Sequence, residues 1–227
     1  TAYLLRLADA MEDRGSGLES VTTLGAGGAP VPRRLCERLI ATMPQARLLI
    51  IYGSTEAEPM AAALMEEFVE SPGDGYLVGR LSEAATISLV ELPATMPVLD
   101  EREMTPWEVP PGSVGEVVVR GPHVLKGYVD NPAADAETKL KAPDGGVWHR
   151  TGDLARWDDE QRLWLVGRLS DRITLDSGQV VDPYPIEAGI DNIPGVRRAS
   201  AVQSRAGAEV VIELHPAAEP EAVLTGV

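Results

Sequence analysis

The sequence is poor in cysteine, in aromatic residues and in positive charge. A single cysteine, Cys36, excludes an internal disulfide and fits a reducing compartment. Twenty Lys and Arg against 35 Asp and Glu give a net charge of −15, which argues against binding nucleic acid or an anionic membrane through bulk electrostatics. There is neither a signal-peptide pattern nor a long apolar span. We therefore expect a cytoplasmic protein, and a phosphate ligand would need local donors, a metal or parts of the protein outside this chain.

The chain has enough apolar material for a folded core. Apolar residues make up 44% of it, and its 22 Gly and 18 Pro are spread along its length, which is typical of a loop-rich globular protein. The first 52 residues predict, in order, a helix, a short strand, a second helix and a buried strand, over residues 1–14, 21–24, 32–42 and 48–52. This spacing predicts a β-α-β unit with parallel strands and a right-handed crossover.

The rest of the chain predicts two further parts. Residues 56–65 predict a short helix and residues 70–82 a Gly-rich connector. Short strands then follow at 86–92, 114–120, 147–150 and 162–166, and they predict a small appended β-sheet or barrel. Beyond Gly167, strand-like pieces over 168–181, a helix at 185–193 and a hairpin over 196–214 predict a small α+β domain. The predicted fold is α/β with this β subdomain over residues 1–167, followed by an incomplete α+β domain over 168–227.

The buried strand at 48–52 ends in a polar cluster, and ligands of open α/β sheets bind just beyond the carboxyl ends of strands. Tyr52 can stack on a base, and Gly53 allows close approach of the backbone. Thr55 can donate to a phosphate, and Glu56 is the kind of oxygen ligand that Mg²⁺ prefers. The alternative is a strand–turn–helix in which a Ser or Thr caps the helix and Glu56 lies in its first turn. The stretch alone favours this alternative.

Three further sites allow two interpretations each. Gly28-Ala29-Pro30 forms either a flat backbone wall against a base or a plain strand-to-helix turn, and it lacks the pattern of a phosphate loop. Asp153 either accepts hydrogen bonds from ribose hydroxyls or satisfies its own turn. Arg168 either contacts the same sugar or a phosphate, or forms a surface ion pair.

The order of the motifs is more specific than any single motif. Together they resemble the adenylate-forming (AMP-binding) superfamily, which contains the acyl-CoA synthetases, peptide-synthetase adenylation domains and luciferases. The motifs are Gly-Gly-Ala-Pro (27–30), Tyr-Gly-Ser-Thr-Glu (52–56), Val-Gly-Arg (78–80), Gly-Glu-Val-Val-Val-Arg-Gly-Pro (115–122) with Gly127-Tyr128, Arg-Thr-Gly-Asp-Leu (150–154) and Gly-Arg (167–168).

Within this superfamily, the stretches 147–153, 161–168 and 177–187 are most similar to the β-lactone synthetases of bacterial olefin biosynthesis, the fatty-acid AMP ligase branch. The resemblance implies a ligase that forms an acyl-AMP from a carboxylic acid, here a fatty or β-hydroxy fatty acid, and Mg-ATP. The acyl group would then pass to a thiol, with coenzyme A as one acceptor, or close a β-lactone.

The resemblance also assigns roles to residues. It implies that Thr55 binds the α-phosphate and Glu56 the Mg²⁺, and these two would be the catalytic residues. Asp153 would bind the ribose hydroxyls, and Arg168 would contact the ribose near a hinge at which Ser170 replaces the usual Asp or Lys. The adenine would be held by Gly28, Ala29, Pro30, Tyr52 and Gly53.

Two elements of the superfamily are missing from the sequence. These are a Ser/Thr/Gly-rich phosphate loop with its Lys, expected before Thr1, and a catalytic Lys, expected after Val227. We therefore expect the C-terminal part of a longer enzyme, inactive by itself. The alternative is a non-catalytic nucleotide-binding or interaction module that keeps the fold. The sequence makes no prediction of oligomeric state.

Overall fold

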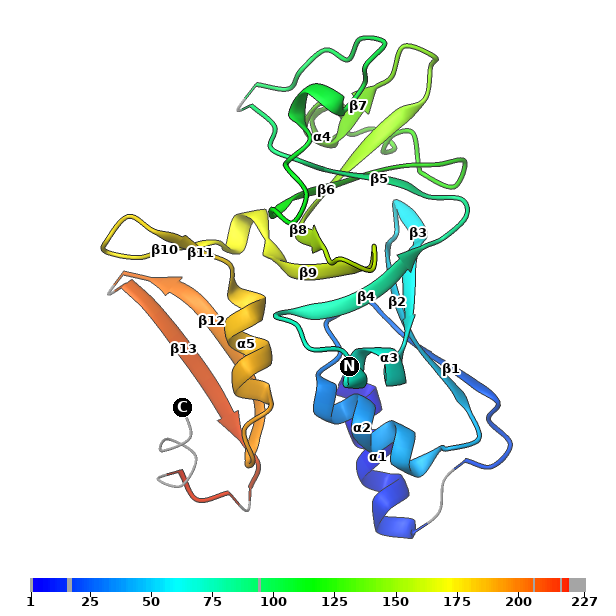
Figure 1. Ribbon diagram of the computed structural model, residues 1–227, viewed down its shortest axis with the longest axis vertical. Coiled ribbons are helices and arrows are strands. Elements are labelled where there is room, and N and C mark those ends of the chain that lie inside the picture. The colour runs from blue at the N-terminus through cyan, green and yellow to red at the C-terminus, as the bar shows by residue number, and fades with distance from the viewer. Residues whose placement is uncertain (1, 16–17, 94, 206, 217, 221–227) are drawn as a thin grey trace.

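A nine-stranded mixed sheet forms the centre of the protein, seen in a computed structural model that describes residues 2–15, 18–93, 95–205, 207–216 and 218–220 (Figure 1). The strand order is β1-β2-β3-β4-β9-β8-β6-β5, and β7 pairs with β8. The strands are β1 (Thr23–Ala26), β2 (Arg47–Ser54), β3 (Ala57–Leu64), β4 (Tyr76–Leu81), β5 (Thr86–Val90), β6 (Gly115–Arg120), β7 (Lys139–Lys141), β8 (Val147–Trp157) and β9 (Leu163–Arg168).

The predicted β-α-β unit is confirmed. Strand β1 runs parallel to β2, with Thr23 opposite Arg47, and helix α2 (Arg33–Thr42) connects them. Helix α1 (Ala2–Arg14) packs beside α2. Cys36 is fully buried on α2, so it is a packing residue. None of the described helices has the length and apolar composition needed to cross a membrane.

The predicted helix at 56–65 is wrong, because Ala57–Leu64 forms strand β3. It pairs antiparallel with β2 on one side, where Tyr52 faces Ala61, and with β4 on the other, where Ala61 faces Leu81. A run of alanines favours a helix in isolation, but paired backbone on both sides overrides that propensity here. Only the short helix α3 (Met65–Glu70) follows the strand.

The predicted Gly-rich connector at 70–82 contains a strand, and this changes the architecture. Strand β4 pairs with β3 and with β9, so the expected appended sheet is continuous with the first one instead of forming a separate sheet or barrel. Gly79 makes this pairing possible: its φ is +86°, and a Cβ there would lie 2.1 Å from the carbonyl oxygen of Ala62. Helix α4 (Pro132–Thr138) and strand β7 were not predicted.

The C-terminal part is a small α+β arrangement, as predicted. Helix α5 (Pro183–Asp191) packs against the β12–β13 hairpin on one side and against β4 and β9 on the other. Residue 206, within the predicted hairpin over 196–214, lies outside the described residues. The division of the chain at residue 167 stays a prediction. The strands of this part are β10 (Ile173–Thr174), β11 (Val180–Val181), β12 (Val196–Ser204) and β13 (Gly207–Leu214), and its 3-10 turn is η2 (Leu169–Asp171). Another 3-10 turn, η1 (Thr105–Trp107), lies between β5 and β6.

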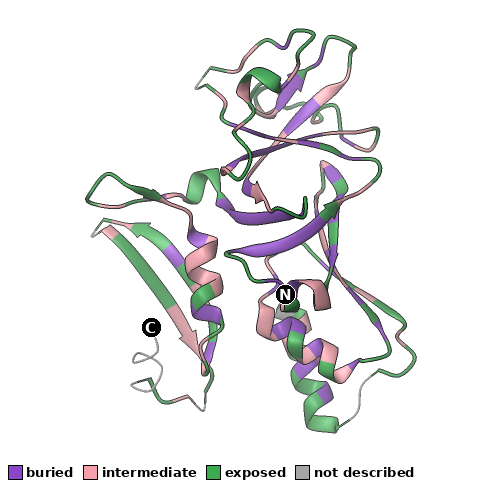
Figure 2. Ribbon diagram, viewed as in Figure 1, coloured by how far each residue is buried: buried purple, intermediate pink, exposed green. Residues whose placement is uncertain are grey.

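The buried core follows the sheet, as the purple segments of β2, β4 and β9 show in Figure 2. Trp164 and Phe68 are among the largest fully buried side chains, and their rings meet edge to face with centroids 6.0 Å apart. This contact packs α3 against β9, so it joins the first half of the sheet to the second.

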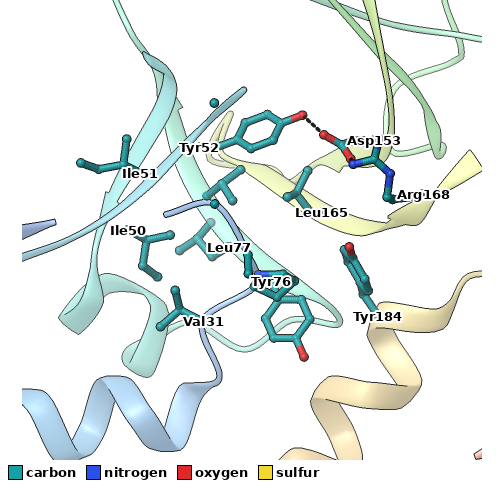
Figure 3. A pocket seen from close by; sticks show the side chains of 15 residues that line it. Val31, Ile50, Ile51, Tyr52, Tyr76, Leu77, Asp153, Leu165, Arg168 and Tyr184 are labelled. Carbon is teal, nitrogen blue, oxygen red and sulfur yellow. Dashed lines mark hydrogen bonds and ion pairs between the residues drawn. The ribbon is translucent and has the colours of Figure 1, made fainter. Parts of the chain in front are cut away.

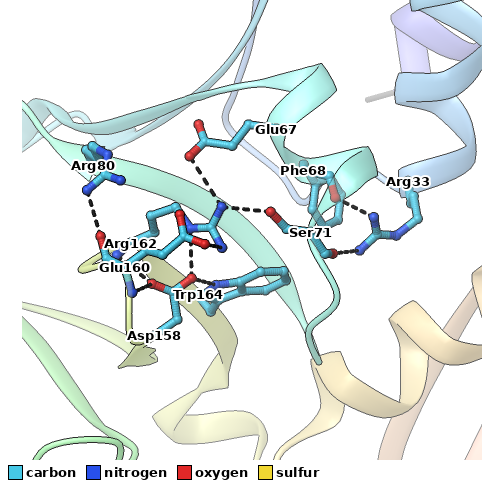
Figure 4. A network of polar contacts seen from close by, with 9 residues as sticks. All are labelled: Arg33, Glu67, Phe68, Ser71, Arg80, Asp158, Glu160, Arg162 and Trp164. Carbon is cyan, nitrogen blue, oxygen red and sulfur yellow. Dashed lines mark hydrogen bonds and ion pairs between the residues drawn. The ribbon is translucent and has the colours of Figure 1, made fainter.

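A polar network fixes the same region (Figure 4). Arg162 is 7% exposed, and its guanidinium donates to Asp158 at 2.8 Å and to the Ser71 hydroxyl at 2.7 Å. The indole of Trp164 donates to the same Asp158 carboxylate at 2.9 Å. Arg33 donates to the carbonyl oxygens of Phe68, Val69 and Ser71. The network therefore holds the segment before β4 against the turn before β9.

We predict that Arg162→Met lowers the free energy of unfolding by about 3 kcal/mol, because it leaves the carboxylate of Asp158 without its buried cation. Chemical denaturation measures this change. Arg102→Ala is the control: Arg102 pairs with Asp100 in solvent, so its removal costs less than about 0.5 kcal/mol. Equal effects of the two substitutions would contradict the structural role of the network.

Candidate functional site

A pocket lies where the carboxyl end of β2 meets β4, β8, β9 and the start of α5 (Figure 3). Most residues that the sequence assigned to a nucleotide line it, namely Gly28, Ala29, Pro30, Tyr52, Gly53, Asp153 and Arg168. Thr55 and Glu56 are not among its lining residues. The remaining lining is mainly aliphatic and aromatic: Val31, Ile50, Ile51, Tyr76, Leu77, Val78, Leu165 and Tyr184.

The loop after β1 forms one wall of the pocket. A Cβ on Gly27 would lie 2.6 Å from the carbonyl oxygen of Ile51, so a glycine lets this loop lie directly against β2. The next residue, Gly28, has φ +77°, which favours glycine. The Gly28–Pro30 stretch is therefore a strand-to-helix turn that also lines the pocket, and its contact with a base stays a prediction.

Three polar side chains meet at one side of the pocket. The Tyr52 hydroxyl donates to Oδ2 of Asp153 at 2.7 Å, across 101 positions in the sequence. Nη1 of Arg168 lies 3.1 Å from Oδ1 of the same carboxylate. Asp153 and Arg168 face each other in the β8–β9 register. Each oxygen of Asp153 thus has one protein donor and keeps a lone pair for a ligand hydroxyl.

Thr151 explains why the Asp153 carboxylate is available. The Thr151 hydroxyl accepts from the backbone N–H of Asp153 at 3.0 Å and donates to the carbonyl oxygen of Val117 at 2.9 Å. Thr151 therefore satisfies the backbone N–H of Asp153 within β8, and the interpretation of Asp153 as a turn residue that satisfies its own backbone is wrong. Arg168 also donates to the carbonyl oxygen of Thr151 at 3.1 Å. Its side chain is 50% exposed, so the ion pair with Asp153 lies at the protein surface while Arg168 also lines the pocket, and its contact with a sugar or a phosphate stays a prediction.

Burial has the largest effect on the protonation of the Asp153 carboxyl group. Desolvation is the main effect on the pKa of Asp153 and raises it, while the Tyr52 hydrogen bond and the Arg168 charge lower it. Desolvation, followed by the Asp153 charge, raises the pKa of Tyr52 well above its ordinary value. Tyr52 therefore keeps its proton and donates it to the hydrogen bond.

Thr55 and Glu56 lie at the turn between β2 and β3. Because a strand follows this turn, the interpretation of these residues as a helix cap is wrong. Thr55 is exposed. Glu56 accepts a hydrogen bond from the Tyr128 hydroxyl at 2.8 Å, and this bond is the main reason that the pKa of Glu56 is lowered.

A single ionised carboxylate is compatible with magnesium that is bound mainly by substrate phosphates. Mg²⁺ usually takes one or two carboxylates together with substrate phosphates and waters. Within the described residues there is no group of three or more His, Cys, Asp and Glu that could hold a metal unaided. Glu56 therefore fits the shared kind of site and not a dedicated metal cage.

Sequence reasoning missed three side chains near the predicted residues. Tyr76 lies at the start of β4, inside the predicted connector, and Tyr184 lies in the first turn of α5. Tyr128 belongs to one of the recognised motifs, but no role was assigned to it. Contacts between segments that are far apart in the sequence place all three side chains, and no local sequence pattern indicates these contacts.

We predict that Tyr52→Phe raises the pKa of Asp153 further, because the variant loses a hydrogen bond that stabilises the carboxylate. Carboxyl NMR titration measures the shift, and Tyr3→Phe at an exposed position is the control. Because folding raises the pKa of Asp153, protonation of this carboxyl group stabilises the folded state. The stabilisation is complete below the pKa of Asp153 in the unfolded chain and is lost as the pH rises through its pKa in the folded state. An unchanged or lower pKa in Tyr52→Phe would contradict the geometry.

Comparison with known proteins gives consistent matches. A family model described as AMP-binding enzyme matches residues 2–129. The chain is 36% identical over 187 residues to 4-coumarate–CoA ligase-like 9 of Arabidopsis thaliana, covering 82% of this chain and 30% of that protein. It is 31% identical over 212 residues to 4-coumarate–CoA ligase 1 of the same plant, covering 92% of this chain and 35% of that protein. The chain thus spans about a third of the length of these relatives.

A solved structure matches nearly the whole chain. The amide bond synthetase McbA from Marinactinospora thermotolerans superposes with a TM-score of 0.73 at 26% identity. The match covers 99% of this chain and 43% of that one. The arrangement of the central sheet and the C-terminal α+β part therefore recurs in a known protein.

Proposed function

The chain belongs to the AMP-binding enzyme family, and from this premise we propose that it forms the nucleoside-binding part of an ATP-dependent, acid-activating ligase. The superfamily expected from the sequence motifs is confirmed by the family match. Because the chain spans about a third of its relatives, the activity of a whole enzyme is part of the proposal.

The observation that carries the proposal is the contact of three side chains at the edge of the pocket, those of Tyr52, Asp153 and Arg168. In it, the hydrogen bond of its hydroxyl holds the ring of Tyr52, which offers a face to an adenine, and the backbone of Gly28–Pro30 contacts the same base. The Asp153 carboxylate accepts from the ribose hydroxyls, and Arg168 contacts the sugar. Gly53 lines the same pocket, and a Cβ on it would lie 2.9 Å from Cγ of Glu58, so a glycine here lets β2 turn tightly into β3.

The phosphates would lie beyond the end of β2. The exposed hydroxyl of Thr55 donates to the α-phosphate, and the Glu56 carboxylate holds the Mg²⁺. When bound, Mg²⁺ supplies positive charge to the phosphate oxygens. Tyr128 orients the Glu56 carboxylate through its 2.8 Å hydrogen bond. These residues position charge instead of exchanging protons.

The proposed reaction is acyl-adenylate formation. A carboxylate oxygen of the acid attacks the α-phosphorus and forms a new O–P bond, while the bond from that phosphorus to the bridging oxygen breaks and pyrophosphate leaves. The residues of this chain bind the nucleoside and align the α-phosphorus for in-line attack. In the proposed second step, the sulfur of a deprotonated thiol, for which coenzyme A is the proposed acceptor, attacks the acyl carbon and forms a C–S bond, while the C–O bond to the phosphate breaks and AMP leaves.

The acid is proposed from the relatives. Those described above are named for 4-coumarate, and they give no support to the narrower expectation of a β-lactone synthetase or of a fatty acid. We therefore place an aromatic acid first. A pyrophosphate-release screen of the longer protein against aryl, fatty and β-hydroxy acids tests this order, and a response to fatty acids alone would reverse it.

We predict that the longer protein expected to carry this chain binds AMP, and that Asp153→Ala weakens binding about 10- to 100-fold, because a charged hydrogen-bond acceptor is lost. Calorimetric titration measures the dissociation constant. Asp100→Ala, which removes an exposed carboxylate, is the control and leaves the constant unchanged. AMP binding that is absent, or indifferent to Asp153→Ala, would favour a module without a nucleotide site here.

Residues 1–227 alone are predicted to bind AMP only weakly and to show no turnover. The residues proposed here hold the nucleoside and one side of the phosphates, and the sequence lacks both lysine-bearing elements of the superfamily. A pyrophosphate-release assay with the purified chain checks this. Release at the rate of the longer protein would overturn the assignment of the chain as an incomplete site.

A further inference from the structure

One wall of the pocket comes from the C-terminal part of the chain. Tyr184, in the first turn of α5, lines the pocket together with residues of β2, β4 and β9 (Figure 3). Of the lining residues, it is the one that follows Arg168 in the sequence. The pocket is therefore complete only while α5 is docked on the central sheet.

Tyr76 connects this wall to the body of α5. The rings of Tyr76 and Tyr184 meet edge to face, with centroids 5.3 Å apart and planes at 76°. The Tyr76 hydroxyl donates to Oδ2 of Asp191 at 3.1 Å, and the other Asp191 oxygen accepts from the backbone N–H of Ala199 at 2.8 Å. Asp191 is 7% exposed. Tyr76 thus touches the pocket and the end of α5, and Asp191 extends the connection to β12.

The start of α5 packs directly against Gly167 of β9. A Cβ on Gly167 would lie 2.8 Å from Cδ of Pro183, which belongs to a rigid ring. Gly167 itself does not line the pocket. A substitution there tests the placement of α5 without removing any group that faces the ligand.

The Tyr184 hydroxyl is available to a ligand. Within the described part of the chain it makes no hydrogen bond, and Figure 3 shows its oxygen on the side of Leu165 and Arg168. Burial, followed by the charge of Asp153, raises the pKa of Tyr184 to about 12. The hydroxyl therefore stays protonated as a hydrogen-bond donor.

We propose that Tyr184 is a nucleoside-binding residue supplied by the C-terminal part of the chain, and that the contacts of Tyr76 with Tyr184 and Asp191 couple occupancy of the pocket to docking of α5. The proposal rests on the proposed nucleotide site. A nucleoside that packs against Tyr184 binds better when α5 is docked, so by linkage it stabilises the docked state to the same degree.

Calorimetric titration of AMP into the longer protein tests the contact. Tyr184→Ala is expected to weaken binding about 10-fold, the usual effect of losing an aromatic face from a base. Tyr184→Phe keeps the ring and is expected to weaken binding about 3-fold through loss of one neutral hydrogen bond. Tyr3→Ala, at an 85% exposed tyrosine, is the matched control and leaves binding unchanged.

Hydrogen exchange of the α5 amides tests the coupling. AMP is expected to slow exchange in α5 of the wild type, and this slowing disappears in Tyr184→Ala. Gly167→Ala is expected to speed exchange at the start of α5 and to weaken AMP binding. A purely structural Tyr184 would change exchange equally with and without AMP.

The outcomes separate the two proposals. A wild type that does not bind AMP overturns the proposed function, and this assignment with it. A wild type that binds AMP, with unchanged affinity in both Tyr184 variants or with α5 exchange indifferent to AMP, overturns this assignment alone. Tyr184→Phe keeps the question decidable if Tyr184→Ala does not fold.

Discussion

A buried carboxylate is the constraint on which the site depends. Asp153 sits in a largely desolvated position, where a charge is costly unless hydrogen-bonding partners surround it. Its partners come from two other strands: Tyr52 lies near the end of β2, and Arg168 ends β9 opposite Asp153 in the sheet register. Satisfying this one group therefore requires three distant segments to meet at a single edge, and the pocket lies at that edge.

The rest of the fold brings these segments together. Strand β4 joins the first strands to β9, and Gly79 allows the close approach to β3 that this needs. The Arg162 network and the Phe68–Trp164 contact hold the segment before β4 against β9. The polar side chains of the site are thus held in place by a packed, largely apolar sheet, as pre-organised binding sites require.

The sequence predicted the composition of the site better than its geometry. The motif order identified Tyr52, Asp153 and Arg168, and the structure brings all three to one pocket. The hydroxyl of Tyr52 as a partner of Asp153 was not predictable, because 101 positions separate the two residues. Ala57–Leu64 was predicted as a helix, since propensity is local and strand pairing is not. Tyr76 lies in the stretch predicted as a Gly-rich connector, and Tyr184 lies just before the helix predicted at 185–193, so no pattern assigned either residue to the site.

The central claim is that this pocket holds an adenine nucleoside, with Asp153 at the ribose. A crystal structure of the longer protein grown with AMP tests it most directly. The account predicts the adenine between Gly28–Pro30 and the ring of Tyr52, with the ribose hydroxyls within hydrogen-bond distance of the Asp153 carboxylate. AMP bound elsewhere on the molecule, or in this pocket with its ribose turned away from Asp153, would contradict it.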